Sequence, residues 1–417
     1  MDEKMMENEI QAPKTKNRFW SGVLSGVLLT CIIFGGIYIG KQLFKLYAMG
    51  NAEVSTSVKE GTDNINRKMS VIEDTIEKYY LEEVDGAQLL DGVYSGMVDS
   101  LGDPYSEYYS LEELEEMMME TEGIYYGIGA YVSLDTATKL CMISGVIEGT
   151  PAEEAKLRTG DIIYKVDGTS TEGMDTSEVV SLIKGEENTT VHLTLVRDGE
   201  SDYVEVDVER RKIETPTVNY EMLEGDIGYI QITEFDEVTM DQFTEALAVC
   251  KGSDMKGLIL DLRSNPGGSL AAVCDIAGKM LPKGLIVYTE DKYGEKQEYT
   301  CEGKSPIQVP VVVLVNGYSA SASEILAGAL KDHNIATIMG TTTYGKGIVQ
   351  RIIGLSDGSA LKLTVSKYYT PAGNDIHGVG IEPDIEIEYD ADAYYDEGID
   401  NQLEAAKEYM AEEIAKQ

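Results

Sequence analysis

Three serines at alternate positions give the sequence its first candidate nucleophiles. Ser319, Ser321 and Ser323 lie in VNGYSASASEILAGAL, residues 315–330, directly after the apolar run VPVVVLV at 309–315. The apolar run predicts a strand, and the Ala-rich segment predicts a helix. Backbone N–H groups at the start of a helix favour negative charge, so a serine at this junction is suited to acyl transfer.

A serine nucleophile needs a base, and histidine is the first candidate. The chain has three histidines, His192, His333 and His377. The segment GYSAS at 317–321 resembles a nucleophile elbow directed at Ser319, although the final glycine of that motif is missing. Only His377 follows an acidic residue in the order expected of an elbow hydrolase. A pair of Ser319 and His377 acting on esters therefore stays open as an alternative.

Lysine is the other candidate base, because an amine replaces imidazole in Ser-Lys hydrolases. Lys346 stands out in TTTYGKGIVQ, residues 341–350, since its flanking glycines allow close packing and apolar residues follow. An ordinary lysine, with a pKa of about 10.4, is protonated at neutral pH, whereas desolvation moves the pKa toward about 7 to 8. Ser181 and Lys184 also fit S-x-x-K, but they lack the accompanying SDN and KTG motifs.

The segment that carries these candidates alternates strands and helices. This alternation predicts a mixed α/β core with a mainly parallel sheet and helices on its faces. Loops at the carboxyl ends of such strands form the site. The expected strands are 225–232, 257–262, 285–289, 309–315 and 359–371, and the expected helices are 240–250, 270–281 and 320–330.

Residues 121–212 change to short β-branched runs, with the Gly-rich entry YYGIGAYV followed by ISGVIEGTPAEEAKLRTGDIIYKVDGTS. This β-rich segment resembles a PDZ domain. The resemblance implies that the loop Gly127, Ile128, Gly129 and Ala130 captures a chain-terminal carboxylate with its N–H groups. A bound peptide would then add as an extra strand at the sheet edge.

The N-terminal part of the chain predicts a membrane anchor. Residues 19–40 form a run of 22 positions without a charge, long enough to span a bilayer as a helix. Lysine and arginine precede the run, so residues 1–18 are expected in the cytoplasm and the catalytic body outside it, as a single-pass protein of the cell membrane. A cleaved signal peptide, or a lipoprotein modified at Cys31, is the alternative.

The amino-acid composition limits which kinds of partner, metal site and disulfide the chain can be expected to have. The formal net charge of −40 repels polyphosphate, so nucleic acid is not expected as a partner. Five scattered cysteines give no zinc pattern and no dense disulfide framework, which leaves at most one bridge open. Residues 51–120 predict a helical arm that leaves a homodimer open, and residues 391–417 predict a C-terminal helix.

Four motifs behind the PDZ-like segment carry a resemblance to a known family. DLRSNPGG, VNGYSASASEILAGAL, TYGKGIVQ and YYTPAGNDIHGVGIEPD, in this order, resemble the carboxy-terminal processing peptidases, also called tail-specific proteases, over residues 70–390. The resemblance implies that Ser321 is the nucleophile, that Lys346 is the base and that Gln350 orients the lysine.

The same resemblance implies an oxyanion hole made by the backbone N–H groups of Gly267 or Gly268 and of Ala322. The expected protein is a membrane-anchored extracytoplasmic serine endopeptidase with its core at 213–390. It would recognise protein C-terminal tails through the PDZ domain and need no metal or cofactor. A catalytically inactive PDZ receptor is the alternative class.

Overall fold

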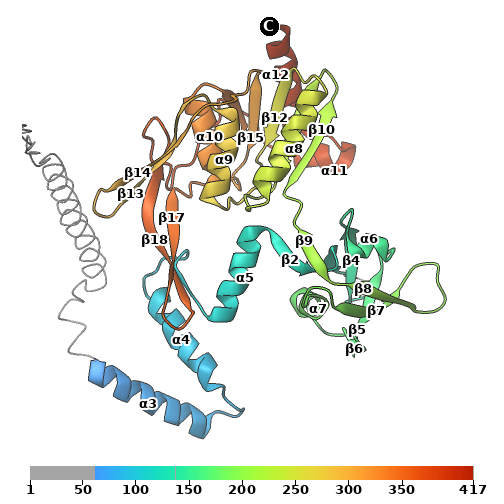
Figure 1. Ribbon diagram of the computed structural model, residues 1–417, viewed down its shortest axis with the longest axis vertical. Coiled ribbons are helices and arrows are strands. Elements are labelled where there is room, and N and C mark those ends of the chain that lie inside the picture. Colours follow the sequence, from blue (N-terminus) through green and yellow to red (C-terminus); the bar gives the residue numbers. More distant parts are fainter. Residues whose placement is uncertain (1–61, 137, 417) are drawn as a thin grey trace, which may run out of the picture. The chain divides into compact units, whose positions relative to one another are not determined.

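The computed structural model describes residues 62–136 and 138–416 (Figure 1). The chain divides into two units between Leu89 and Leu90. The described part of the first unit contains α3 (Thr62–Tyr79) and the start of α4 (Gly86–Asp99). No helix within the described residues combines the length and the apolar character needed to cross a bilayer. The predicted anchor, 19–40, and the tail before it lie outside the described residues.

A six-stranded sheet organises the core of the second unit. Its strands, in spatial order, are β10 (Val218–Leu223), β11 (Ile227–Ile232), β12 (Gly257–Asp261), β15 (Val311–Val315), β16 (Ala336–Gly340) and β19 (Ile385–Glu386). All neighbouring pairs are parallel except β10 and β11. The mainly parallel sheet predicted from the sequence is therefore present.

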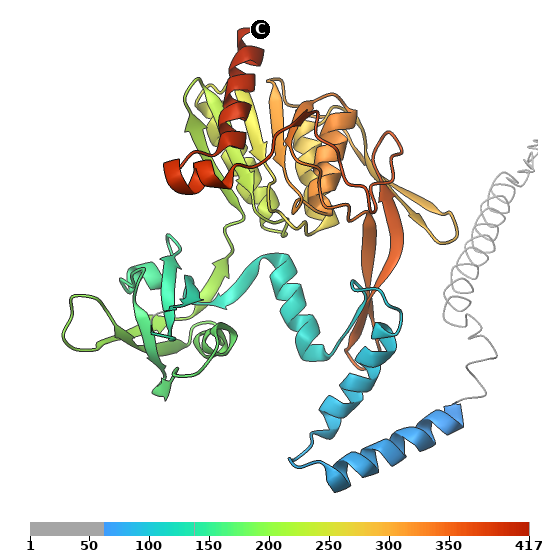
Figure 2. The same cartoon turned by 180° about the vertical axis from the view of Figure 1, so that it is seen from behind.

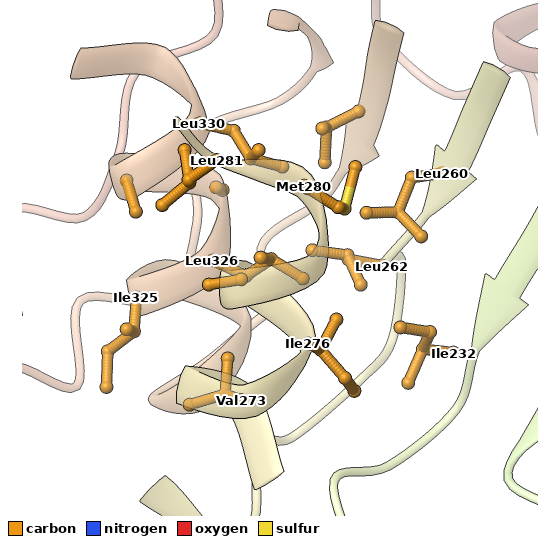
Figure 3. Packing of buried hydrophobic residues seen from close by; sticks show 14 of the residues in the cluster. Ile232, Leu260, Leu262, Val273, Ile276, Met280, Leu281, Ile325, Leu326 and Leu330 are labelled. Atoms are coloured by element: carbon orange, nitrogen blue, oxygen red, sulfur yellow. The ribbon is translucent and has the colours of Figure 1, made fainter. Parts of the chain in front are cut away.

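Helices cover both faces of this sheet. Those on one face are α8 (Thr239–Gly252), α9 (Leu270–Met280) and α10 (Ala322–Asp332), and α12 (Asn401–Ala415) covers the other. Figure 3 shows α9 and α10 packing onto Leu260 and Leu262, and Figure 2 shows α12 across the opposite face. Alternate residues of a strand face opposite sides, so Ile259 instead meets Ala406 and Met410 of α12. This double burial explains why β15 is apolar along its length and β12 is apolar up to its last residue, Asp261.

A second, antiparallel sheet carries the residues that face the serine. It contains β1 (Glu107–Tyr109), β18 (Ala360–Tyr369), β13 (Gly284–Asp291) and β14 (Lys296–Cys301), with β17 (Ile348–Gly354) also paired to β18. The strands expected at 285–289 and 359–371 therefore belong to this antiparallel sheet and not to the mainly parallel one. Gly294, at φ +78°, closes a tight β13–β14 hairpin, and a hairpin makes its strands antiparallel neighbours.

The PDZ segment forms its own sheet and core. Its elements are β3 (Ala130–Leu134), β4 (Cys141–Val146), α6 (Pro151–Glu154), β5 (Ile162–Val166), β6 (Thr169–Ser170), α7 (Thr176–Ile183), β7 (Thr190–Val196) and β8 (Val204–Glu209). β3 is an edge strand of this sheet. The chain enters from α5 (Leu111–Glu122) along β2 (Ile124–Gly127) and leaves along β9 (Arg211–Glu214), which pairs with β2. Edge strand β3 leaves room for an added peptide strand.

The C-terminal segment contains two helices where one was predicted. α11 (Ala391–Glu397) ends at Gly398, whose φ of +72° is typical of a left-handed helix cap, and α12 follows. Asp400 caps α12 and pairs with Arg263, which also binds the fully buried Asp261 at 2.6 Å. The last helix is thereby attached to the segment that follows β12.

Candidate active site

The structure places Ser321 at the junction between the loop after β15 and helix α10. It is the residue before the helix, with φ +53° and ψ −111°. A non-glycine residue in this region costs about 1–3 kcal/mol, which is typical of functional turns. Ser321 is half-buried, whereas Ser319 and Ser323 are fully buried. Ser321 lines a cavity whose described lining includes neither Ser319 nor Ser323.

The two neighbouring serines support the backbone. Ser319 donates its hydroxyl to the carbonyl of Leu262 at 2.7 Å and accepts from the amide of Asn316 at 2.9 Å. Ser323 donates to the carbonyl of Asn265 at 3.0 Å. Both hydroxyls are thus used in holding the serine turn to the loop after β12. This geometry disfavours the elbow alternative at Ser319.

Lys346 lies between β16 and β17 and lines the same cavity as Ser321. Burial lowers its pKa below the ordinary lysine value and the neighbouring Lys362 lowers it further, against the opposing effect of nearby carboxylates. The direction agrees with the sequence argument for a neutral amine. The Lys346 nitrogen lies 4.5 Å from the centre of the Tyr105 ring, and it makes no hydrogen bond or ion pair with any described residue.

The glycines beside Lys346 are required by packing. Gly345 has φ +88°, and a Cβ at Gly347 would lie 2.6 Å from the backbone nitrogen of His377. A larger residue at either position would push the lysine segment away from its neighbours. His377 itself is exposed and does not line the cavity.

The side chain of Glu324 connects the turn at Ser321 to the segment around Lys346, and our sequence analysis did not identify this residue. Its carboxylate is fully buried and accepts from the amides of Ser321 at 2.9 Å, Lys346 at 2.8 Å and Gly345 at 2.7 Å, and from the Thr343 hydroxyl at 2.6 Å. Four donors satisfy a carboxylate that would otherwise be costly to bury. The available signal was the Ser-x-x-Glu spacing at a predicted helix start, which is the capping-box pattern.

Tyr368 forms a second tie between the same segments. Its ring is buried, and its hydroxyl donates to the carbonyl of Ser321 at 3.0 Å and also lies against the carbonyl of Lys346. Burial, followed by the charge of Glu324, raises the pKa of Tyr368 well above its ordinary value. The phenol therefore stays protonated and can remain a donor.

The predicted oxyanion-hole residues are not equivalent. The amide of Gly267 already donates to the Asn265 side chain at 2.9 Å. The amides of Gly268 and Ala322 form no hydrogen bond with any described residue. A Cβ at Gly267 would lie 2.7 Å from the Ser321 Cβ, so this loop packs directly on the serine. The amides of Gly268 and Ala322 are therefore available to a developing oxyanion, whereas that of Gly267 is already used.

Gln350 lies on β17 at the wall of the same cavity. Its amide donates to the Thr364 hydroxyl at 3.1 Å and does not contact the Lys346 nitrogen in this conformation. The structure therefore brings the glutamine to the predicted site without the predicted hydrogen bond.

The cavity has a volume of about 680 Å³ and contains all of the predicted catalytic side chains. Among the described residues its lining includes Ser321, Lys346 and Gln350, but no histidine. A serine beside a partly desolvated lysine, with free amides next to it, can perform acyl transfer by the Ser-Lys route.

The predicted carboxylate loop of the PDZ segment has free amides as well. Gly129 has φ +83°, and its carbonyl accepts from the Thr150 hydroxyl at 3.2 Å. The amides of Ile128 and Gly129 form no hydrogen bond with any described residue. Gly127 ends β2, and Ala130 begins the edge strand β3. A free carboxylate could bind these amides while its chain pairs with β3.

Three segments of the chain match known protein families. Residues 226–387 match Peptidase family S41, residues 142–197 match the PDZ domain, and residues 30–113 match the N-terminal domain of the activating protease CtpB.

Whole-chain relatives agree with these matches. The carboxy-terminal processing protease CtpA of Bacillus subtilis is 36% identical over 364 residues, which cover 87% of this chain and 76% of the relative. A carboxy-terminal-processing protease of Bartonella bacilliformis is 36% identical over 341 residues, 80% of this chain and 78% of the relative. Among solved structures, the photosystem II D1 C-terminal processing protease is 32% identical, covering 76% of this chain and 86% of its own, with a TM-score of 0.46.

Proposed function

The chain belongs to peptidase family S41, among the carboxy-terminal processing serine proteases with a PDZ domain, and we propose that it cleaves by a Ser321–Lys346 mechanism. The observation that carries the proposal is the shared cavity. Ser321 and Lys346 line it together, the buried carboxylate of Glu324 holds both backbones, and the pKa of the lysine is lowered.

In the proposed reaction, neutral Lys346 removes the hydroxyl proton of Ser321, and the alkoxide attacks the scissile carbonyl. The amides of Gly268 and Ala322 donate to the oxyanion, and each such donor contributes roughly 3 kcal/mol. The lysine ammonium then protonates the leaving amine, and the neutral amine next activates the water that releases the acyl group.

One side-chain movement precedes this chemistry. The Lys346 nitrogen rests on the Tyr105 ring, so rotation about its own side-chain bonds must bring it to the Ser321 hydroxyl. Once there, Gln350 would exchange its bond to Thr364 for one to the lysine and fix its direction. We expect bound substrate, which displaces water from the cavity, to favour this arrangement.

Replacement of Lys346 by alanine tests the mechanism. We expect kcat on an internally quenched peptide to fall by about 10⁴-fold or more, as when a member of a catalytic unit is removed. Lys292→Ala removes an exposed hairpin lysine and serves as the matched control. Wild-type cleavage by the Lys346→Ala variant would refute the lysine base. Loss of cleavage on His377→Ala, with Lys346→Ala active, would instead support the elbow alternative.

The PDZ domain is proposed to recruit substrates by their C-terminal carboxylates. The free amides of Ile128 and Gly129 beside edge strand β3 support this role. Binding of matched peptides with free and amidated C-termini to the full-length Ser321→Ala variant tests it. Equal affinities would rule out carboxylate capture.

We also propose that residues 19–40 anchor the protein in the cell membrane, with the catalytic body outside the cytoplasm, and that the helical arm at 51–120 pairs two copies. The support for the anchor is the uncharged run and the preceding basic residues. Extraction of membranes at alkaline pH and protease accessibility of intact cells test the anchor. Light scattering of the purified chain tests the dimer, and a monomer at all concentrations would exclude it.

A further inference from the structure

One wall of the catalytic cavity carries an acidic cluster that the proposed mechanism does not use. Asp236, Glu234 and Glu120 all line this cavity. Asp236 is only 6% exposed as a residue, its carboxylate opens onto the cavity, and it forms no hydrogen bond or ion pair with any described residue. Buried carboxylates are ordinarily paired or hydrogen-bonded, so this one requires an explanation.

The cluster lies close to the reacting groups. Phe235 donates its amide to the carbonyl of Gly267 at 2.8 Å, and its own carbonyl accepts from the amide of Ser269 at 2.6 Å. Asp236 is therefore the next residue after a direct backbone pairing with the proposed oxyanion loop. An extended substrate advances about 3.3 Å per residue, so the cluster can face a residue near the scissile bond.

No cation of the described chain compensates the cluster. Lys362, on another part of the cavity wall, pairs with Glu107 at 3.0 Å, and Lys346 lies against Tyr105. Burial, together with the charges of Glu234 on its own loop and Glu120 on α5, raises the pKa of Asp236 to about 7. The carboxylate is thus half ionised near neutral pH and lacks a positive partner.

We propose that Asp236, with Glu234 and Glu120, forms a subsite for the cationic side chain of a lysine or arginine close to the scissile bond of the substrate. An ammonium or guanidinium group supplies the donors and the charge that the Asp236 carboxylate lacks. A neutral side chain of equal length would leave the carboxylate unpaired. The inference rests on the proposed function, because it assigns substrate preference to the same cavity.

Peptides that differ at a single position test the subsite. Lysine and its uncharged near-isostere norleucine are placed in turn at the three positions on each side of the scissile bond, and full-length protein in detergent is assayed. At one position we expect kcat/KM at pH 8 to favour lysine by about 10- to 100-fold, the low end of the range for close charge pairs. In Asp236→Asn this ratio should fall close to 1, and in Glu234→Gln it should fall in part.

The pH dependence of the ratio gives a second signature. The ratio of kcat/KM for the lysine peptide to that for the norleucine peptide should rise between pH 6 and pH 8 as Asp236 ionises. Titration of Lys346 affects both peptides equally, so it cancels in this ratio. Asp236→Asn removes an unpaired buried charge, so its melting temperature should not fall. Glu245→Gln, which changes an exposed carboxylate on α8, is the matched control and should keep the wild-type ratio.

Binding to the inert Ser321→Ala variant separates the subsite from the chemistry. A lysine preference in affinity that Asp236→Asn abolishes supports the subsite even if wild-type protein fails to cleave any peptide, an outcome that would refute only the proposed function. Ratios near 1 at every position, in cleavage and in binding, would overturn the subsite while Ser321-dependent hydrolysis stands.

Discussion

The two glycine loops, Gly267–Gly268 beside Ser321 and Gly127–Gly129 at the start of the PDZ sheet, offer the same chemical group to different ligands. Each presents amides without a partner among the described residues, and each is supported by a buried hydroxyl, Ser323 or Thr150. In the proposed mechanism, the first loop would donate to a negative charge that exists only during the reaction. The second would bind a substrate carboxylate that is charged before it arrives.

The loops differ in how tightly they are held. A Cβ at Gly268 would overlap the backbone carbonyl of Phe235, and backbone cannot move aside without disturbing the adjoining sheet. A Cβ at Gly129 would overlap the side chain of Thr150. Stabilising a short-lived oxyanion requires donors fixed in advance, whereas binding of a permanent carboxylate tolerates some adjustment. We expect the two loops to respond differently to the same substitutions.

Gly268→Ala should have the largest effect. The new Cβ and the φ of +134° both displace the amide that faces the oxyanion, so kcat should fall by about 10²- to 10³-fold. Affinity for a C-terminal peptide should not change. Gly294→Ala, at a positive φ in open space, controls for strain alone. Unchanged kcat in Gly268→Ala would remove this loop from the proposed oxyanion hole.

Gly129→Ala should weaken binding of a peptide with a free C-terminus by about 10- to 100-fold, the size expected when a charge loses a buried hydrogen-bonding site. Hydrolysis of a short peptide that cannot reach the PDZ loop should keep its kcat. Gly168→Ala has a similar φ of +82° but meets no neighbour, so it is the matched control. Calorimetry measures the peptide affinity of both variants. Equal losses of affinity in Gly129→Ala and Gly168→Ala would indicate a general effect of backbone strain.

The functions of the two loops should also differ in their pH dependence, which can be measured on the wild-type protein. Since the Lys346 pKa is lowered and only the neutral amine acts as base, kcat/KM should rise about tenfold per pH unit below that pKa and level off above it, before pH 10.4. A terminal carboxylate, with a pKa near 3.5, stays charged from pH 6 to pH 9, so peptide affinity should be flat. A plateau only above pH 10.4 would contradict a desolvated lysine.

The supporting hydroxyls should give the smallest effects. Ser323→Ala and Thr150→Val each remove one buried donor, and each should lower the free energy of unfolding by about 1 kcal/mol. The first should reduce kcat and the second peptide affinity, each by a few-fold. Chemical denaturation and the two assays measure this, and a crossed pattern would mean that the loops are coupled.

Local signals in the sequence were sufficient for much of the fold. Apolar runs such as 309–315 and Ala-rich segments such as 320–330 located β15 and α10 within two residues. The pairing of strands was harder to predict from the sequence, because the residues of β13 predict a strand whether its neighbour is parallel or antiparallel. The two-residue strand β19 is too short for periodicity to detect, and β16 begins with Ala and Thr and carries no continuous apolar run like that of β15.

The residues of the candidate site also fall into those that the sequence predicted and those that it did not. Ser321 and Lys346 were found by resemblance to a motif, and the cavity contains both. Glu324 and Tyr368 were missed as parts of the site, since their partners lie elsewhere in the chain and hydrogen bonds between distant segments leave no periodic pattern. Asp236 was missed for a related reason: a carboxylate is unusual only when its burial is known.

The tie through Glu324 also sets when, during synthesis, the chain can begin to cut. The Ser321 turn is made first, but its buried carboxylate finds three of its four donors in the later segment 343–346. An interior carboxylate without those donors is costly, so the turn forms only when the later segment docks. The arrangement around Ser321 is therefore complete only in a chain that has been synthesised past residue 346.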